Sequence, residues 1–136
     1  MCGIVGYIGS NFAEIVVVDG LKRLEYRGYD SAGLATPLDG VLKLRRQVGK
    51  IANLEREILR EPVEAHVGVG HTRWATHGAP TVANTHPHTD AAHSIAVVHY
   101  GIIENYLEIR QKPEAEGCVF SSATATEVVP HLVATQ

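Results

Sequence analysis

The sequence predicts an α/β (α+β) domain in which sheets and helices form layers, and three observations support this. The chain has 136 residues, of which 45% are hydrophobic and 20% charged, as is typical of one globular domain. Short apolar runs alternate with segments of helical periodicity in the order β-α-β-β-α-β-β-α-β-α. One pair of predicted strands is joined by the turn signal Pro37-Leu38-Asp39-Gly40, which indicates a hairpin inside the layered domain.

In the first half of the chain, strands alternate with helices. Ile4–Ile8 forms a predicted strand almost at the N-terminus, which would hold residue 2 at a sheet edge. A helix follows, with Ser10 or Asn11 as its N-cap, and ends near Gly28. Further along we expect a hairpin of strands 32–36 and 41–46, and then a helix that carries Ile51, Leu54 and Ile58 and stops before Pro62.

The second half begins with a predicted strand at Val67–His71 and then becomes polar. Residues 71–90 are rich in Thr, His, Pro and Asn, so we interpret them as a functional loop outside the core. Beyond this loop we expect a strand at 94–98, a helix around 104–111 and a strand at 119–122. A capping box between Thr124 and Glu127 then predicts a last helix.

Charge and hydropathy exclude several classes of partner. The net charge of −3 offers no basic surface for nucleic acid or an anionic membrane. No apolar run is long enough to span a bilayer, and no signal peptide is visible. Cys2 and Cys118 are far apart in sequence, which favours the reducing cytoplasm over a disulfide framework. Cys118 lies in an apolar run and is predicted to be a buried strand residue.

Cys2 directly follows the initiator methionine, and removal of Met1 would make it the N-terminal residue. Thiols and α-amino groups have reference pKa values of about 8.5 and about 7.7–8.0. The amine could therefore take the proton of the thiol, directly or through one water, as covalent catalysis requires. Chains also begin Met-Cys by chance, so the other segments decide this question.

Four segments are dense in groups that bind or orient a ligand: MCGIVGYIG, RLEYRGYDSAG, GHTRWATHG and VVHYGIIENY. In this order the chain resembles the class II glutamine amidotransferase domain, an N-terminal-nucleophile hydrolase. RLEYRGYDSAG and HTRWATHG are typical of one branch, the glucosamine-6-phosphate synthases (glutamine–fructose-6-phosphate aminotransferases, isomerizing). The resemblance covers essentially the whole chain. It implies a four-layer αββα sandwich with mainly antiparallel sheets, and a glutaminase that supplies ammonia for glucosamine-6-phosphate synthesis.

The resemblance also implies a role for individual residues. Cys2 would attack the side-chain amide of glutamine, release ammonia and leave a glutamyl thioester. The backbone N–H of Gly101 would help to stabilise the oxyanion, and Arg27 would place positive charge near the thiol. Arg73 would bind the α-carboxylate of glutamine through two parallel hydrogen bonds. The loop expected to close over glutamine carries Trp74, Thr76 and His77.

Two residues depart from the family pattern. Tyr100 stands where the family has an asparagine, whose amide is the second oxyanion donor; losing such a donor typically costs about 10²–10³ in rate. Ala125 stands where the family has an aspartate that receives the α-ammonium of glutamine, and losing one partner of a desolvated ion pair costs about 2–5 kcal/mol. The alternative to an active glutaminase is therefore a catalytically impaired or inactive remnant, at most a weak glutamine-binding module.

The chain is also shorter than the family pattern. In the family the glutaminase domain continues with further strands and then joins two sugar isomerase domains. We therefore expect residues 1–136 to be only the N-terminal part of a type 2 glutamine amidotransferase domain, with an incomplete sandwich. Fructose-6-phosphate would be bound only through the absent isomerase domains, and a homodimer is expected for the full-length protein.

Histidines raise the further alternative of a metal module. His86 and His88 form an H-x-H pair, and other histidines are nearby in sequence. Pro87 separates the pair in a predicted loop, and no third ligand stands at a recognisable spacing. We interpret these histidines as hydrogen-bonded structural groups, and we predict neither a metal nor another cofactor.

Overall fold

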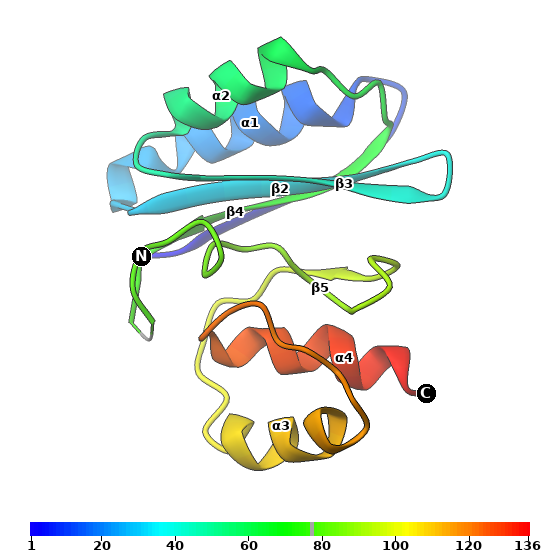
Figure 1. Cartoon of the computed structure of the whole chain (residues 1–136). Coiled ribbons are helices and arrows are strands. Elements are labelled where there is room, and N and C mark those ends of the chain that lie inside the picture. The colour runs from blue at the N-terminus through cyan, green and yellow to red at the C-terminus, as the bar shows by residue number, and fades with distance from the viewer. Residues whose placement is uncertain (77) are drawn as a thin grey trace.

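The computed structural model describes residues 1–76 and 78–136, and these form four layers (Figure 1). Two helices cover a four-stranded sheet, and on its other side lie a two-stranded sheet and two further helices. This is the αββα order predicted above. In chain order the elements are β1 (Gly3–Ile8), α1 (Ala13–Arg23), β2 (Ser31–Leu38), β3 (Val41–Val48), α2 (Ile51–Arg60), β4 (Val67–Arg73), β5 (His88–Thr89), β6 (Ala96–Val97), α3 (Tyr106–Ala115) and α4 (Val128–Ala134), with 3-10 turns at Glu25–Arg27 and Ala125–Glu127.

All neighbouring strands of the larger sheet are antiparallel, in the order β1-β4-β2-β3. The hairpin predicted between β2 and β3 is confirmed, with Leu38 opposite Val41. Its two turn residues, Asp39 and Gly40, have φ values of 53° and 75°, as a type I′ turn requires. The strand at β4 is confirmed as well, and it extends two residues beyond the prediction to Arg73. Because β4 is an inner strand, the residues at its end are fixed from both sides.

The apolar core lies between the larger sheet and the helices α1 and α2. Both helices turn a buried face to the sheet, and Leu34 of β2 is buried beneath them. The helical spacing read from Ile51, Leu54 and Ile58 is confirmed, since all three are buried on α2. Burial of such a face stabilises a short helix more than its intrinsic propensity does.

The opposite face of the sheet is polar and buried. Side chains of a strand alternate between faces, so His71 and Arg73 of β4 point away from the apolar core. Residues of the polar segment cover them, and five of its polar side chains beyond β4 are buried: Asn84, Thr85, His86, His88 and Asp90. The expectation that residues 71–90 lie outside the core is therefore wrong for its second half, which fills the space between the two sheets.

The strand expected at 119–122 does not form. Val119 is 81% exposed, and residues 118–122 pair with no strand among the described residues. The backbone N–H groups of Ser121 and Ser122 donate to the carboxylate of Glu127 at 2.7 Å each, in place of a sheet partner. The second predicted strand of this region, 94–98, is reduced to the two residues of β6.

The predicted helix caps are also wrong. Phe12 is the N-cap of α1 and makes no side-chain cap bond, while the backbone N–H of Ala13 donates to Ala65 O at 2.8 Å. Thr124 makes no capping bond to the last helix, because its hydroxyl pairs with His88 instead. The partners that replaced these caps come from distant parts of the chain, which local sequence patterns do not report.

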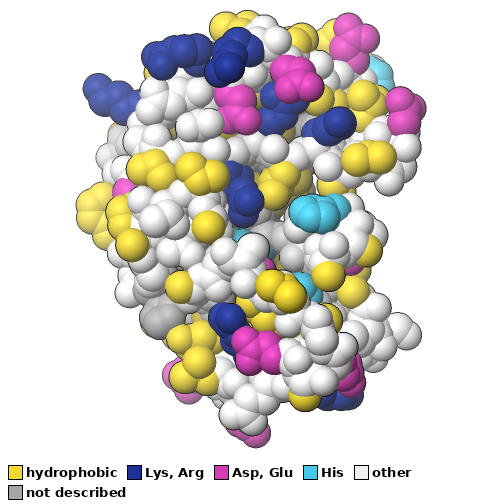
Figure 2. Space-filling model, in the orientation of Figure 1, with side chains coloured by type: hydrophobic (Ala, Val, Ile, Leu, Met, Phe, Trp, Pro, Cys, Tyr) yellow, Lys and Arg dark blue, Asp and Glu magenta, His cyan; other side chains and the backbone are white. Residues whose placement is uncertain are grey.

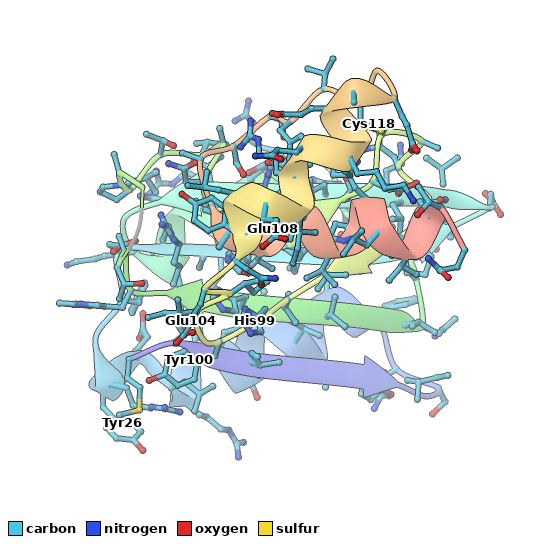
Figure 3. The ribbon with its side chains drawn as sticks, turned by 90° about the horizontal axis from the view of Figure 1, so that it is seen from below. Tyr26, His99, Tyr100, Glu104, Glu108 and Cys118 are labelled. Atoms are coloured by element: carbon cyan, nitrogen blue, oxygen red, sulfur yellow. The ribbon has the colours of Figure 1, made fainter. Side chains whose placement is uncertain are left out.

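Cys118 is a further correction. It lies in a loop after the C-terminal end of α3 and is partly exposed, rather than buried in a strand (Figure 3).

The surface carries no dominant sign of charge on the face shown in Figure 2, where acidic and basic side chains mix over the α1 and α2 layer. Within residues 1–76 and 78–136, no helix has the length and apolar character needed to cross a membrane.

Candidate active site

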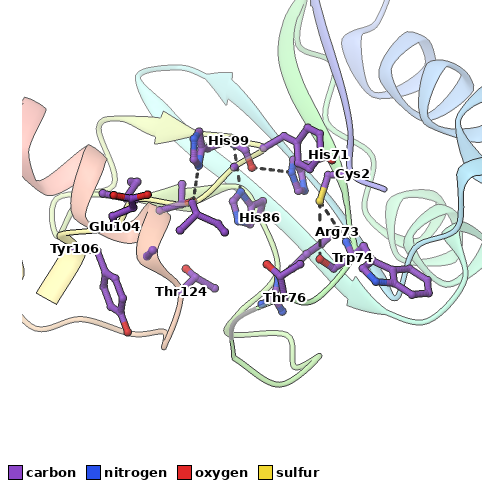
Figure 4. A pocket seen from close by; sticks show the side chains of 16 residues that line it. Cys2, His71, Arg73, Trp74, Thr76, His86, His99, Glu104, Tyr106 and Thr124 are labelled. Carbon is purple, nitrogen blue, oxygen red and sulfur yellow. Dashed lines mark hydrogen bonds between the residues drawn. The ribbon is translucent and has the colours of Figure 1, made fainter.

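A cavity of about 650 Å³ opens between the end of β4 and the second half of the chain (Figure 4). Its wall is built from five parts of the sequence: Cys2, the stretch from His71 to Thr76, His86 from the buried polar segment, residues 99–106, and residues 124–126. Segments far apart in sequence thus meet at one place.

Cys2 is placed by the pairing of β1 with β4. Gly3 lies opposite Thr72, and the Gly3 N–H donates to the Thr72 hydroxyl at 3.0 Å. Continuing this register sets Cys2 across from Arg73, on the same face of the sheet. The backbone N–H of Trp74 donates to Cys2 Sγ at 3.3 Å. This bond fixes the sulfur at the end of β4, next to the stretch that begins with Trp74.

The N-terminal amine lies next to Arg27, the residue expected to place positive charge near the thiol. The amine of Met1 donates to the carbonyl oxygens of Arg27 and Gly28 at 3.2 Å each. Arg27 therefore holds the N-terminus through its backbone. Its side chain is not part of the cavity wall.

Arg73 is 4% exposed, and two carbonyls of the following loop hold its guanidinium. Nη1 donates to Ala79 O at 3.2 Å and Nη2 donates to Gly78 O at 3.1 Å. Burial lowers the pKa of Arg73 from 12.5, and the nearby carboxylate of Asp30 acts in the opposite direction. Arginine stays protonated through such a shift, so the cavity wall keeps one fixed positive charge beside Cys2.

Asp30 bonds the backbone beside the site, and the sequence reasoning did not single it out. Its Oδ2 accepts a hydrogen bond of 2.5 Å from the Ala75 N–H, and its own N–H donates to Arg73 O at 2.8 Å. These two bonds fix the backbone on both sides of Trp74. The signal was present in the sequence, since Asp30 lies inside the specific segment RLEYRGYDSAG.

Three histidines form a connected group on the cavity wall. His71 Nε2 donates to His99 O at 3.0 Å, and His99 N–H donates to His86 Nδ1 at 3.3 Å. The rings of His71 and His86 stack with centroids 4.2 Å apart. Burial lowers the pKa of His71 from 6.5 to about 4 and lowers that of His86 further. Both imidazoles are therefore neutral at pH 7.

Residues 124–126 form the wall opposite β4, and side-chain bonds hold them there. The Thr124 hydroxyl is 2.7 Å from His88 Nε2, and the Thr126 hydroxyl is 3.1 Å from His99 Nδ1. Glu127 anchors the preceding residues through Ser121 and Ser122. Burial would raise the pKa of Glu127, but its hydrogen bonds outweigh burial and lower the pKa below 4.5. This wall is thus tied to the histidine group on one side and to a buried carboxylate on the other.

The structure brings most of the sequence-predicted site residues together. The cavity wall includes Cys2, Arg73, Trp74, Thr76, Tyr100, Gly101 and Ala125. Gly101 has a φ of 150°, and a Cβ there would lie 3.1 Å from the His99 ring. Arg27 is beside the N-terminus but outside the wall, and His77 lies outside the described residues.

The histidines do not form a metal centre in the described part of the chain. Within it, no three His, Cys, Asp or Glu side chains converge closely enough to hold a metal ion. His86 and His88 meet edge to face, with ring centroids 4.6 Å apart, and each pairs with a group of the protein.

Comparison with solved structures supports the fold. The glutamine phosphoribosylpyrophosphate (PRPP) amidotransferase of B. subtilis, in complex with ADP and GMP, superimposes with a TM-score of 0.81 at 25% identity. A second structure, described as the allosteric regulatory enzyme of purine biosynthesis, gives a TM-score of 0.82 at 24% identity. Each match covers 100% of this chain and 30% of the other.

Sequence comparison finds relatives described as glutamine–fructose-6-phosphate aminotransferase (isomerizing). That of Symbiobacterium thermophilum is 55% identical over 134 residues, and that of Gloeobacter violaceus is 57% identical over 135. The protein of the same description from Mycobacterium tuberculosis is 56% identical over 137 residues. Each alignment covers 98% of this chain, which spans only 22% of the length of these relatives.

A family profile described as a glutamine amidotransferase domain matches residues 56–136, which is more than half of the chain. The matched region contains Arg73, Gly101 and most of the cavity wall. With the αββα fold and an N-terminal Cys2 beside Arg73, the chain belongs to the glutamine amidotransferase domain family.

Proposed function

We propose that residues 1–136 are the N-terminal part of a type 2 glutamine amidotransferase domain, the glutaminase half of a glutamine–fructose-6-phosphate aminotransferase. The domain would hydrolyse glutamine through Cys2 and supply ammonia for glucosamine-6-phosphate synthesis in the cytoplasm. The observation that carries this proposal is the hydrogen bond from the Trp74 N–H to Cys2 Sγ, at the mouth of a cavity that also contains Arg73. The names of the relatives, at 55% and 57% identity, support the choice of reaction.

In the proposed reaction, removal of Met1 leaves Cys2 with a free α-amino group that takes the proton of the thiol. The thiolate then attacks the side-chain amide carbon of glutamine, and the Gly101 N–H receives the developing negative charge on oxygen. The C–N bond breaks, ammonia leaves with one proton, and a thioester to Cys2 remains. Water hydrolyses the thioester to glutamate and regenerates the thiol.

Arg73 would orient the substrate by binding its α-carboxylate. A planar guanidinium fits a carboxylate through two parallel hydrogen bonds, so it fixes direction as well as adding affinity. Trp74 and Thr76, which lie on the stretch beyond β4, would close over the bound amide and exclude water from the thioester.

The rest of the reaction would involve parts beyond the glutaminase domain. Transfer of ammonia to fructose-6-phosphate requires sugar-binding domains, and the relatives are long enough to contain them, because this chain spans 22% of their length. A homodimer is proposed for the full-length protein.

The test is covalent labelling with a glutamine analogue that carries a diazoketone in place of the side-chain amide. The purified chain is incubated with the analogue, digested and read by mass spectrometry. We expect loss of Met1 and modification of Cys2, with Cys118 unmodified because it lies at the far end of α3 (Figure 3). Equal or faster labelling of Cys118, with Cys2 unmodified, would overturn the proposal.

An impaired glutaminase is the second candidate function, and two positions on the cavity wall favour it. Tyr100 is 57% exposed at the cavity and Ala125 offers only a methyl group. The labelling experiment separates the two candidates when ammonia release is measured on the same sample. Labelled Cys2 with very slow turnover of glutamine would identify the impaired form.

A further inference from the structure

The two charged side chains on the cavity wall lie apart from each other. Among the described residues that line it, Arg73 is the one arginine or lysine, and Glu104 is the one carboxylate. Figure 4 shows Glu104 beside Tyr106, at the opposite end of the view from Cys2 and Arg73. A ligand whose amide reaches Cys2 and whose carboxylate reaches Arg73 is therefore remote from Glu104.

Two carboxylates that bond residues next to the wall, Asp30 and Glu127, are themselves outside it and already bound. Asp30 accepts hydrogen bonds from the Ala75 N–H and the Ser31 hydroxyl. Glu127 accepts from the backbone and hydroxyl groups of Ser121 and Ser122. Neither carboxylate reaches into the cavity to receive a cationic group of a ligand.

Four further polar side chains of the described cavity wall also do not favour an ammonium ion. His71 and His86 are neutral, because burial lowers the pKa of both. The hydroxyls of Thr124 and Thr126 pair with His88 and His99. An ammonium held here would lose water without gaining a counter-charge, which is costly in a partly enclosed site.

The same wall is favourable for an uncharged group. Ala125 presents a methyl between the two threonines, and Tyr100, Ile102, Ile103 and Tyr106 line the continuation of the cavity. An acyl group on the ligand nitrogen would contact these side chains and remove apolar surface from water. It would also convert the ammonium to a neutral amide.

We propose that this site prefers an N-acylglutamine, a glutamine with a free carboxylate and an acylated α-nitrogen, and that Ala125 determines this specificity. The proposal rests on the proposed function, since it uses the same amide hydrolysis at Cys2. The thiolate adds to the side-chain amide carbon, the C–N bond breaks and ammonia leaves. Water then cleaves the thioester, so one N-acylglutamine and one water give one N-acylglutamate and one ammonia.

The experiment compares glutamine with N-acetylglutamine on the chain with Met1 removed. Ammonia release gives kcat/KM for each compound, and titration calorimetry on the Cys2→Ala variant gives each Kd without turnover. We expect a preference for N-acetylglutamine of at least about tenfold in both measurements, because only glutamine leaves a buried charge unpaired. A preference for glutamine in the calorimetry would overturn the inference.

The Ala125→Asp variant tests the residue assigned to this specificity. A carboxylate at position 125 would pair with the ammonium of glutamine and lie against the acyl group of N-acetylglutamine, so we expect the preference to reverse. Ala123→Asp is the matched control, because it adds the same charge two residues away on an exposed position outside the wall. Equal shifts in both variants would contradict the assignment.

The two proposals fail in different ways. If Cys2 resists the diazoketone analogue and neither compound releases ammonia, the proposed glutaminase is wrong. If Cys2 is labelled but glutamine binds and reacts better than N-acetylglutamine, the glutaminase stands and the preference for an acylated nitrogen is wrong.

Discussion

Trp74 donates its backbone N–H to Cys2 Sγ at 3.3 Å, although 72 positions separate the two residues in sequence. The contact depends on the register of β1 with β4, in which Gly3 lies opposite Thr72. A slip of one residue in this register would turn Cys2 to the helical face of the sheet. The environment of the candidate nucleophile is therefore set by strand pairing. Cys2 can contact Trp74 from its position near the N-terminus because the first strand begins at residue 3.

Replacement of Cys2 by serine tests the nucleophile. We expect ammonia release to fall by at least about 10³-fold, because the thiolate forms the covalent intermediate. The free energy of unfolding should change by less than about 0.5 kcal/mol, since Cys2 precedes the first strand and is only half-buried. Ammonia release and urea denaturation measure the two effects. Cys118→Ser is the control, and a comparable loss of activity in that variant would contradict the assignment.

Asp30 is predicted to position the backbone around Trp74. In Asp30→Ala the Ala75 N–H loses its carboxylate partner, so we expect the free energy of unfolding to fall by about 1.5–3 kcal/mol. We also expect slower labelling of Cys2, because the donor to Sγ sits in the peptide next to the released bond. Asp19→Ala is the matched control on an exposed face of α1. Equal effects of the two substitutions on labelling would exclude a positioning role.

Tyr100 is predicted to limit the rate of glutamine hydrolysis. Tyr100→Asn places a compact amide at the cavity beside Gly101, where the resemblance puts the second oxyanion donor. We expect kcat to rise by about 10–10²-fold, because one such donor is typically worth about 10²–10³. Tyr26→Asn serves as the control, since Tyr26 is 86% exposed and outside the cavity wall. An unchanged kcat in Tyr100→Asn would show that this position does not limit the reaction.

Elements whose pattern depends on neighbouring residues were predictable from the sequence. The hairpin of β2 and β3 follows from Asp39-Gly40, which accepts two positive φ angles. The helix α2 follows from the spacing of Ile51, Leu54 and Ile58. In these cases turn chemistry and amphipathic periodicity agree with the final packing, so local information was sufficient.

The failures occur where polar side chains form hydrogen bonds that the local sequence pattern does not indicate. Residues 119–122 have the composition of a strand, but the carboxylate of Glu127 takes the N–H groups of Ser121 and Ser122. Thr124 has the position of a cap, but His88 binds its hydroxyl from 36 residues away. A buried polar group must find a partner, and its choice depends on tertiary structure.

The candidate site shows the same division. Cys2, Arg73 and Gly101 were found through motifs, and the structure brings all three to one cavity. Asp30 was missed because it acts through backbone groups, and a motif does not reveal which hydrogen bonds a carboxylate makes. The stacking of His71 on His86 was missed because it joins two segments across the space between the sheets.

Stability is predicted to fall as the pH drops from 7.5 to 5. Burial lowers the pKa of His71 and of His88 from 6.5 to about 4, so the unfolded chain binds protons before the folded chain does. Their contribution is complete above pH 6.5 and is lost progressively toward pH 4, at roughly 2 kcal/mol each by pH 5. Glu14 acts in the opposite sense, because burial raises its pKa. Urea denaturation at several pH values measures the net slope.

Two variants identify the source of this pH dependence. His88→Gln removes one titrating group and should flatten the slope between pH 7.5 and 5. Asn53→Gln is the control and should leave the slope unchanged, because it removes no titrating group. A slope that is identical in the wild-type chain and in His88→Gln would contradict the assignment to the buried histidines.

The close approach of the polar segment to the sheet predicts a strong effect at one glycine. A Cβ at Gly33 of β2 would overlap the carbonyl oxygen of His86 and lie 2.9 Å from that of Arg45, and neither backbone group can rotate away. We expect Gly33→Ala to lower the free energy of unfolding by about 1–3 kcal/mol and to weaken labelling of Cys2, because His86 is pushed toward the cavity. Gly6→Ala on β1 is the matched control, since a Cβ there meets no atom within 4 Å. Equal losses for both variants in urea denaturation would contradict a specific clash at Gly33, because alanine at a strand position without a clash is expected to stabilise the protein through the unfolded chain.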